Sequence, residues 1–387
     1  MRTPSDGIDV LHVIPTLAIG GAEHMLATLV TAPRNQLLRQ AVAQLLPGDQ
    51  LVEPIRSSGV AVYQIGIAGL WQAPLAVVRL AGLIRHLRPR VIQSWVYYAD
   101  LVSLWALEMS GRRPKTRLYW GIRCSYLDFS NYGWILQWTM RACARRASRP
   151  DAIVANSYVG RDIHRKLGYR TKSFFVIPNG VDAERFRPDP QARAKLRNDL
   201  GIQNEQGLVI HVARVDPIKN HGLLLAVAQG MPSLRFLAVG QHTEKLNGPP
   251  NVLGLGLRRD VPQLLAAADA LVMTSDGEGF PNVVAEAMAA GLPVVSTDAG
   301  DARRIVGDTG TIVPPRDRDA MIAALRDLFE HPDETRQDRG MRARARIDRE
   351  FSLRSYVAAF DALHLRDQVP VECDETHVMD AGSWATR

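Results

Sequence analysis

The sequence predicts an α/β protein of two doubly wound domains, each with helices on both faces of a parallel sheet. Short continuous apolar runs alternate with helical patterns along most of the chain, which is typical of strands buried on both sides. The alternation stops once, in segment 176–195, and then restarts. A chain of 387 residues is also too long for one small core, so two domains of similar size are expected.

The first half begins with the apolar run 8–15, which we interpret as a strand, followed by a Gly20-Gly21 turn. The other strands expected here are 40–46, 60–65, 90–95, 117–121, 151–155 and 174–177. The helices expected between them are 22–30, 74–86, 99–109, 132–147 and 158–167. Strands that alternate with helices in this way favour a parallel sheet with helical crossovers.

The linker is placed in segment 176–195, because Asn179-Gly180 predicts a turn and Pro178, Pro188 and Pro190 are expected to stop regular structure. The second set of strands is 207–213, 234–240, 251–256, 269–275, 293–298 and 309–314. Its helices are 219–229, 260–267, 281–290 and 317–330, and two more follow at 333–348 and 352–366. The predicted organisation is a first domain 1–180, a second domain 181–350, a terminal helix 351–367 and a loose tail 368–387.

The composition is that of a soluble globular protein, with 46% hydrophobic residues, 22% charged residues and a mean hydropathy of −0.09. The amino terminus has no basic head before its short apolar run, and no apolar stretch approaches about 18 residues, so neither a signal peptide nor a membrane-spanning helix is expected. Cys124, Cys143 and Cys373 are too few and too scattered for a disulfide framework or a zinc site. The expected location is the cytoplasm.

Positive charge is concentrated in one part of the chain. The formal net charge is +7, and the stretch from Arg112 to Arg149 holds nine Lys and Arg residues against one acid, Asp128. This favours an anionic partner such as a phosphate, an acidic glycan or an anionic membrane surface. No nucleic-acid recognition motif accompanies the charge, so no nucleic-acid partner is expected.

In open α/β sheets, ligands bind beyond the carboxyl ends of the strands, and two such domains are expected to present these edges to a shared crevice. In the second domain, strand 207–213 is followed by Arg214 and Lys219. Two cations at a strand end are suited to a diphosphate, Arg as a fork and Lys as a point charge. A solvated basic loop without a ligand is the competing interpretation.

A second strand-end loop, Asp276–Met288, leads into a helix that we expect to begin at Pro281. Its first turn, from Asn282, offers free amides and a partial positive charge, which is a phosphate seat. Glu278 lies just before that turn, and Glu286 lies four residues after Asn282 on the same face, so the two carboxylates are placed to hold sugars that flank a diphosphate. The alternative is that both only stabilise the helix start, which explains Glu286 poorly because it lies beyond the first turn.

The first domain offers weaker candidates. The amides of Gly20 and Gly21 are placed to meet the same diphosphate, although no dinucleotide fingerprint occurs there. After strand 90–95, Tyr97, Tyr98 and Asp100 are expected at the crevice edge, where aromatic rings stack on a sugar or a lipid. Asp100 has the alternative role of capping a helix 101–109, and packing alone is an equal alternative for Trp95.

Together these segments resemble the retaining, two-domain GT-B glycosyltransferases of family 4. The resemblance covers almost the whole chain, and the motifs occur in the order that the family shows. They are GGAE (20–23), VIPNGVD (176–182), RVDPIKNH (214–221), EGFPNVVAEAMAAGLPVV (278–295) and TGTIVPP (309–315). Glu278 and Glu286 match the family's E-x7-E pattern, and helix 352–366 resembles its terminal helix that packs back on the first domain.

The resemblance implies a nucleotide-diphosphate-sugar donor, held mainly by the second domain and transferred with retention of the anomeric configuration. Arg214 and Lys219 would bind the diphosphate, Glu286 the ribose and Glu278 the transferred sugar. The donor-binding stretch also includes Gly279, Phe280, Pro281 and Asn282. No divalent metal is required in such enzymes, so Arg214, Lys219 and Glu278 are the expected catalytic residues, and the donor is a UDP- or GDP-sugar.

The expected acceptor is a glycan or a lipid-linked glycan bound by the first domain, with Tyr97, Tyr98, Asp100 and Arg123 as candidate contacts. Family members often carry a histidine where Tyr97 and Tyr98 stand, so a first-domain base is not assigned. A nucleotide-sugar epimerase and a non-catalytic nucleotide-sugar-binding subunit remain alternative functions. Segment 131–146 reads as an amphipathic helix with tryptophans beside arginines, which gives the hypothesis of peripheral contact with the inner face of the plasma membrane; the competing interpretation is that its apolar face is buried.

Overall fold

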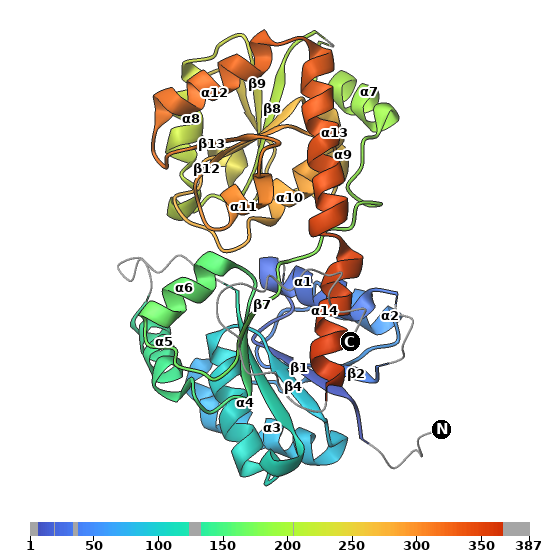
Figure 1. Ribbon diagram of the computed structural model, residues 1–387, viewed down its shortest axis with the longest axis vertical. Coiled ribbons are helices and arrows are strands. Elements are labelled where there is room, and N and C mark those ends of the chain that lie inside the picture. Colours follow the sequence, from blue (N-terminus) through green and yellow to red (C-terminus); the bar gives the residue numbers. More distant parts are fainter. Residues whose placement is uncertain (1–6, 19, 34–37, 124–132, 204, 367–387) are drawn as a thin grey trace. The chain divides into compact units, whose positions relative to one another are not determined.

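The computed structural model describes residues 7–18, 20–33, 38–123, 133–203 and 205–366 (Figure 1). The chain forms two compact units. Unit 1 combines Met1–Pro178 with Tyr356–Arg387, and unit 2 is Asn179–Ser355. Each unit contains its own parallel sheet and its own buried core, which confirms the prediction of two doubly wound α/β domains.

The sheet of unit 1 has seven parallel strands in the order β3-β2-β1-β4-β5-β6-β7. Their bounds are β1 Val10–Ile14, β2 Gln40–Gln44, β3 Ala61–Gln64, β4 Val91–Ser94, β5 Arg117–Ile122, β6 Ala152–Ala155 and β7 Phe174–Val176. The order reverses between β1 and β4, so this is the point where ligands of open α/β sheets are expected. Nearly all residues of β1, β4 and β6 are buried, because helices cover both faces.

Helices α3, α4 and α5 pack side by side, with α4 in the middle. The helices of unit 1 are α1 Gly21–Thr31, α2 Val52–Ser57, α3 Ala73–Leu87, α4 Tyr97–Met109, α5 Trp134–Arg146 and α6 Tyr158–Lys166. From Tyr356 onwards, helix α14 (Leu353–Leu365) belongs to unit 1. Its Tyr356 hydroxyl donates to the carbonyl of Met25 (3.4 Å), and its Phe360 ring stacks on Trp95.

Unit 2 has six parallel strands in the order β10-β9-β8-β11-β12-β13. Their bounds are β8 Leu208–Val212, β9 Arg235–Val239, β10 Val252–Gly254, β11 Ala270–Met273, β12 Val294–Thr297 and β13 Thr311–Val313. The helices are α7 Pro190–Asp199, α8 His221–Gln229, α9 Val261–Ala267, α10 Asn282–Ala289, α11 Ala302–Val306, α12 Arg318–Glu330 and α13 Asp333–Glu350. The strand order reverses between β8 and β11, which places the loops after these two strands at the expected ligand position.

Three local predictions were wrong. Pro190 does not stop regular structure but is the first residue of α7, a position where proline loses no hydrogen bond, and Asp189 caps the helix by accepting from the amide of Ala192 (2.9 Å). Helix α11 lies between the predicted strands 293–298 and 309–314, where no helix was expected. The short helix α2 was not expected at all, because six residues give too little periodic signal.

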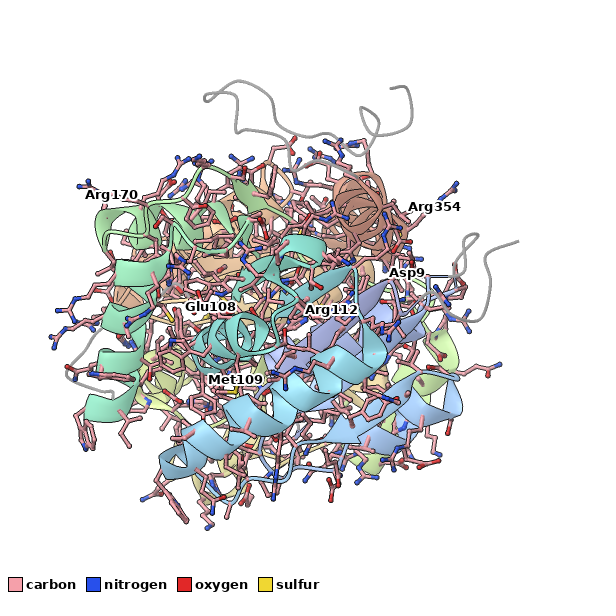
Figure 2. The ribbon with its side chains drawn as sticks, turned by 90° about the horizontal axis from the view of Figure 1, so that it is seen from below. Asp9, Glu108, Met109, Arg112, Arg170 and Arg354 are labelled. Atoms are coloured by element: carbon pink, nitrogen blue, oxygen red, sulfur yellow. The ribbon has the colours of Figure 1, made fainter. Side chains whose placement is uncertain are left out.

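The amino-terminal edge of the unit 1 sheet lies opposite the carboxyl ends of its strands. Figure 2 labels residues of this edge: Asp9 precedes β1, and Glu108 and Met109 close α4. Their contacts are structural, since Asp9 lies 3.8 Å from both Arg39 and Arg90, and Glu108 pairs with Arg149. Among the described residues, no helix is both long and apolar enough to span a membrane.

Candidate functional site

The loops after β8 and β11 bring two of the predicted residues into direct contact. The Nζ atom of Lys219 lies 2.5 Å from Oε1 of Glu278, and both side chains are largely buried. The hydroxyl of Ser275 donates to the same carboxylate oxygen over 2.6 Å. The lysine and the carboxylate therefore form one fixed pair at the carboxyl edge of the sheet.

The loop that carries Lys219 is held by short-range hydrogen bonds. Asp216 accepts from the amide of Ile218 (3.1 Å) and begins a single 3-10 turn, Pro217–Lys219. Asn220 then adopts a left-handed conformation (φ 48°), which asparagine tolerates, and its side chain caps α8 by accepting from Leu223. The hydroxyl of Thr274 on the neighbouring strand end donates to the carbonyl of Lys219 (2.9 Å).

Arg214 lies on the same loop but points to a different partner. Its guanidinium donates to Oδ2 of Asp216 over 2.8 Å, and 61% of its side chain is exposed. The Arg214 side chain holds the pKa of Asp216 below its ordinary value, although burial of that carboxyl works against this. Arg214 is thus an accessible cation next to the lysine loop, tied to one carboxylate.

The glycine-rich turn before α10 is closed by a second backbone segment. The amide of Asp301 donates to the carbonyl of Gly279 (2.9 Å). Gly300 has φ 58°, and a Cβ atom there would lie 2.3 Å from the Gly279 carbonyl oxygen, so only glycine fits. Phe280 is buried with its ring centroid 5.7 Å from that of Phe351. These contacts fix the position of the first turn of α10.

The start of α10 differs in detail from the prediction. Pro281 is the residue before the helix, not its first residue, and the amide of Val284 is used within the turn by donating to the Pro281 carbonyl (3.1 Å). The amides of Asn282 and Val283 remain as candidate donors to an anion. The side-chain oxygen of Asn282 accepts from Nδ2 of Asn179 (2.8 Å), which ties the predicted linker to the helix start.

Glu286 lies one turn further along α10 and is half-buried. Burial raises the pKa of its carboxyl from 4.5 to about 7, and the positive charge of Arg185 opposes this shift. Within the described residues, the carboxyl group makes no hydrogen bond and no ion pair. It is therefore a half-buried acid with unused hydrogen-bonding capacity on the same helix as the anion seat.

Sequence reasoning did not single out several polar groups that shape this edge. Ser275, Asn220 and Asp276 are among them: Asn220 Nδ2 donates to Asp276 Oδ1 (3.0 Å), and Asp276 also pairs with Arg316 (2.8 Å). The available signal was positional, because all three follow or flank strand ends. Hydrogen bonds between the two loops depend on strand order, which the sequence does not display.

In unit 1, the predicted residues are dispersed. Gly20 precedes α1 with an extended backbone, and a Cβ atom there would lie 2.3 Å from a carboxylate oxygen of Glu23, so the chain is tight at this turn. Gly21 is the first residue of α1. Tyr97 is buried, and its hydroxyl lies 2.7 Å from Nε2 of His164, so it is a core residue.

Asp100 is fully buried in the first turn of α4. The expectation that it caps a helix 101–109 was wrong, because the helix begins at Tyr97. Its Oδ1 atom accepts from the hydroxyl of Ser94 (2.5 Å) and from the amide of Gly121 (3.2 Å), and burial raises the pKa of the carboxyl to about 7. Asp100 therefore connects strand ends inside unit 1.

Tyr98 and Arg123 keep polar atoms without partners. The hydroxyl of Tyr98 is buried and has no hydrogen-bond partner within the described ranges, and burial raises its pKa. Arg123 follows β5 directly and lies over the ring of the fully buried Trp95, with 4.1 Å between Cζ and the ring centroid. Of the four residues expected to contact an acceptor, these two and Asp100, whose Oδ2 atom has no partner among the described residues, have unused hydrogen-bonding groups.

Two family models match this chain. Residues 19–185 match "Glycosyltransferase Family 4", and residues 206–331 match "Glycosyl transferases group 1". The two matched regions fall one on each unit and include both sets of strand-end loops described above.

Curated relatives point to the same class. The sulfoquinovosyl transferase SQD2 of Arabidopsis thaliana is 31% identical over 58% of this chain and 46% of its own length. A GDP-mannose-dependent phosphatidylinositol monomannoside mannosyltransferase of Mycolicibacterium smegmatis is 30% identical over 52% of this chain and 60% of its own length. The chain thus spans about half the length of the curated relatives that it matches.

Solved structures share the fold. Anabaena Alr3699/HepE, whose crystal structure was determined in complex with UDP and glucose, has a TM-score of 0.78 at 24% identity and covers 91% of this chain and 98% of its own. Sucrose-phosphate synthase from Thermosynechococcus elongatus has a TM-score of 0.77 at 16% identity, covering 92% and 98%. The chain belongs to the family 4 glycosyltransferases of the GT-B type.

Proposed function

We propose that the protein transfers a hexose-type sugar from a nucleotide-diphosphate sugar to a glycan or lipid-linked glycan acceptor, with retention of the anomeric configuration. The observation that carries this proposal is the Lys219–Glu278 pair beside the first turn of α10. It joins a cation, a carboxylate and free backbone amides at one strand edge. That combination suits a ligand with both phosphate oxygens and sugar hydroxyls.

The diphosphate is assigned to the cations and the amides. Lys219 supplies a largely buried point charge, and Arg214 supplies an exposed fork that can turn from Asp216 to a phosphate. The amides of Asn282 and Val283 add hydrogen bonds at the positive end of α10. This arrangement neutralises the leaving group without a divalent ion. In the described part of the chain, no group of three or more His, Cys, Asp and Glu residues is placed to hold a metal.

The sugars are assigned to the two glutamates. The carboxyl of Glu286 has unused acceptor capacity, and a ribose diol supplies two hydroxyl donors for it. Glu278 already accepts from Lys219 and Ser275, and its second oxygen is assigned to hydroxyls of the transferred hexose. Because both carboxylates flank the proposed phosphate seat, one ligand with a sugar on each side of its diphosphate contacts both cations and both carboxylates.

The proposed reaction is a front-face displacement. The bond between the anomeric carbon and the diphosphate oxygen breaks, while a bond forms between that carbon and an acceptor hydroxyl oxygen on the same face. The acceptor proton passes to the departing phosphate oxygen, so no protein base is needed. Lys219 and Arg214 stabilise the negative charge that develops on the leaving group, which is the largest catalytic contribution expected of the protein.

The donor is proposed to be a UDP- or GDP-sugar, and a stability screen identifies which. A ligand at about 100 times its dissociation constant adds roughly 2.7 kcal/mol to the free energy of unfolding. We expect one nucleotide class in a panel of UDP-, GDP- and ADP-sugars to raise the melting temperature in the presence of EDTA. The purified protein should then hydrolyse that donor slowly. An isomerised donor would favour an epimerase, and binding without hydrolysis or transfer would favour a non-catalytic subunit.

Peripheral membrane contact through α5 is the second part of the proposal. Trp134 is 76% exposed and Trp138 is 54% exposed, so the competing expectation of a buried apolar face does not hold for these two rings. Arg141 and Arg145 continue the exposed surface along the same helix, while residues 131 and 132 of the predicted segment lie outside the described residues. Tryptophan beside arginine suits an anionic lipid surface.

Vesicle sedimentation tests this contact. Wild-type protein is expected to sediment with vesicles that contain phosphatidylglycerol and to remain in solution with phosphatidylcholine alone. The double variant Trp134→Ser, Trp138→Ser should lose this binding, whereas Met341→Ser, an exposed apolar residue of unit 2, should keep it. Equal binding by the double variant and the wild type would remove α5 as the contact.

A further inference from the structure

The guanidinium group of Arg123 is the most conspicuous unsatisfied polar group in unit 1. All three of its nitrogens are buried, and none has a hydrogen-bond partner among the residues that the structure describes. Arginine stays charged in proteins, and a buried charge without a partner is strongly unfavourable. A chain that keeps such a group at a strand end is expected to satisfy it in another state, with a ligand bound.

The surroundings of Arg123 hold its side chain in place. The group lies 4.1 Å from the Trp95 ring centroid and 5.6 Å from that of Phe360 on α14. Aromatic faces attract the guanidinium plane but offer no hydrogen-bond acceptor in that plane. The side chain is therefore oriented by stacking, while its N–H donors are left for another group.

A second unsatisfied group lies on the neighbouring strand end. Asn156 is buried, and its Oδ1 atom has no hydrogen-bond partner in the described part of the chain. Strands β5 and β6 pair Ile122 with Ala155, and the amide of Asn156 donates to the carbonyl of Ile122 (3.2 Å). Arg123 and Asn156 thus each lie one residue beyond the last register pair, at the carboxyl edge where ligands of open α/β sheets bind.

The backbone beside these residues is strained. Val96 has φ 71° and ψ 146°, a conformation that a β-branched residue rarely adopts. It directly follows Trp95, the ring under the guanidinium, and its amide donates to the carbonyl of Gly121 (3.0 Å). Strain of this kind collects at functional sites, where the surrounding structure holds it in place.

The carboxyl of Asp100 is the other candidate partner for Arg123. It attracts the guanidinium electrostatically, and its Oδ2 atom also makes no hydrogen bond to any described residue. No ion pair joins the two groups among the described residues, and Oδ1 of Asp100 is already used by Ser94 and Gly121. Asp100 therefore balances the charge at a distance and leaves the donors of Arg123 unused.

We propose that Arg123 and Asn156 form a binding site for an oxyanion, a phosphate or a carboxylate, that belongs to the acceptor. Arg123 supplies the charge-assisted donors, and Asn156 accepts from a neighbouring hydroxyl of the same molecule. The acceptor class is then an anionic sugar: a sugar phosphate, a phospholipid-linked sugar or a uronic acid. The assignment to an acceptor rests on the proposed glycosyl transfer, whereas oxyanion binding at Arg123 does not.

Ligand-observed NMR on the full chain, saturated with whichever of UDP and GDP it binds to occupy the proposed donor site, tests the proposal. The probes are inorganic phosphate, glucose 1-phosphate, glucuronate and neutral glucose. We expect the three anions to bind and glucose to bind more weakly or not at all. Arg123→Gln should weaken anion binding about tenfold to a hundredfold, because a hydrogen bond to a charged group is lost. Asn156→Ala should weaken glucose 1-phosphate and glucuronate more than inorganic phosphate.

The matched control is Arg170→Gln, an exposed arginine of unit 1 outside both proposed sites, which should bind the anions as the wild type does. Equal anion binding by Arg123→Gln and the wild type would overturn the proposal, as would the absence of anion binding in the wild type. Arg123→Met distinguishes a ligand-binding role of Arg123 from a purely structural one. The methionine keeps an apolar contact with the rings, so the melting temperature of this variant without ligand should not fall. Failure of both UDP and GDP to bind while the anions still bind through Arg123 would count against the proposed function alone.

Discussion

Both units place cations at the carboxyl edge of a sheet, but the side chains that contact these cations differ. In unit 2, Lys219 pairs with Glu278 and Arg214 pairs with Asp216. In the described part of unit 1, Arg123 is buried against aromatic rings without a hydrogen bond. Carboxylates accept hydrogen bonds from the cations of unit 2 in the free protein, whereas the guanidinium of Arg123 lies against ring faces.

The difference has consequences for how each edge binds. A paired cation is already oriented, and an incoming phosphate has to compete with its carboxylate partner, so the edge of unit 2 is stable but selective for ligands of high charge. An unpaired buried cation destabilises the free protein, and even a singly charged oxyanion relieves that cost. Unit 2 is therefore suited to a diphosphate and unit 1 to a smaller anionic group.

The largest effect is expected from Lys219→Ala. The substitution removes the buried charge that stabilises the leaving group, and loss of one such group costs about a hundredfold to a thousandfold in turnover. It also leaves Glu278 largely buried beside Ser275 alone. Donor hydrolysis and transfer to acceptor, measured by release of nucleotide diphosphate, should fall together.

Lys195→Ala, an exposed lysine of α7 on the same unit, is the matched control and should turn over at the wild-type rate. Circular dichroism at the assay temperature shows whether Lys219→Ala is still folded. Turnover within a factor of about three of the wild type by a folded Lys219→Ala protein would show that the paired cation of unit 2 has no role in the reaction.

A smaller effect is expected from Glu286→Gln, and it depends on pH. Burial raises the pKa of Glu286 from 4.5 to about 7, so between these values the folded protein holds a proton that the unfolded chain has released. The free energy of unfolding of the wild type therefore falls as pH rises through this window. The amide of Glu286→Gln does not ionise, so the variant avoids the cost of a buried charge at high pH. It should therefore be more stable than the wild type at pH 8, by about 2 kcal/mol, and similar at pH 4.5.

The nucleotide affinity of the wild type should rise with pH, whereas its free energy of unfolding falls. Hydroxyl donors of a ribose stabilise the ionised carboxylate, so the wild type should bind nucleotide more tightly at pH 8 than at pH 6. Urea unfolding at several pH values and calorimetry with the nucleotide measure the two effects. A wild-type affinity that is independent of pH between 6 and 8 would remove Glu286 from the ribose contact.

The smallest effect is expected from Asp100→Asn in unit 1. Burial raises the pKa of Asp100 to about 7 from 3.8, so this group also makes the wild type less stable as pH rises between these values. The asparagine oxygen can still accept from Ser94 and Gly121, but its buried amide group has no partner. We expect a gain of about 1 kcal/mol at pH 8 and a loss at pH 4, measured by urea unfolding. A variant less stable than the wild type at both values would show that an ionised Asp100 is needed, as a partner of Arg123.

The sequence was sufficient for the sheets and for much of the unit 2 edge, for a physical reason. Strands buried on both faces are continuous apolar runs, and Arg214, Lys219, Glu278 and Glu286 belong to loops and a helix start whose local signals are strong. The pairing of Lys219 with Glu278 was not predicted, because it depends on β8 and β11 being neighbours in the sheet.

Unit 1 was harder to predict at its ligand edge. Tyr97 and Asp100 were expected at the crevice edge because they follow strand 90–95, and helix 99–109 was expected to begin two residues later than α4 does. An earlier start turns both side chains into the core, where they meet His164 and Ser94. The stacking of Arg123 involves Phe360, which is distant in the sequence, so no local sequence pattern predicts the environment of this arginine.

Calorimetric titration of UDP and of GDP, in the presence of EDTA, tests the central claim most directly: the cations and amides of unit 2 neutralise a diphosphate without a metal. We predict that one of the two nucleotides binds the wild type and Lys195→Ala equally, and that Lys219→Ala binds it at least about tenfold more weakly. Binding of equal strength by Lys219→Ala, or wild-type binding that appears only when a divalent ion is added, would contradict the account.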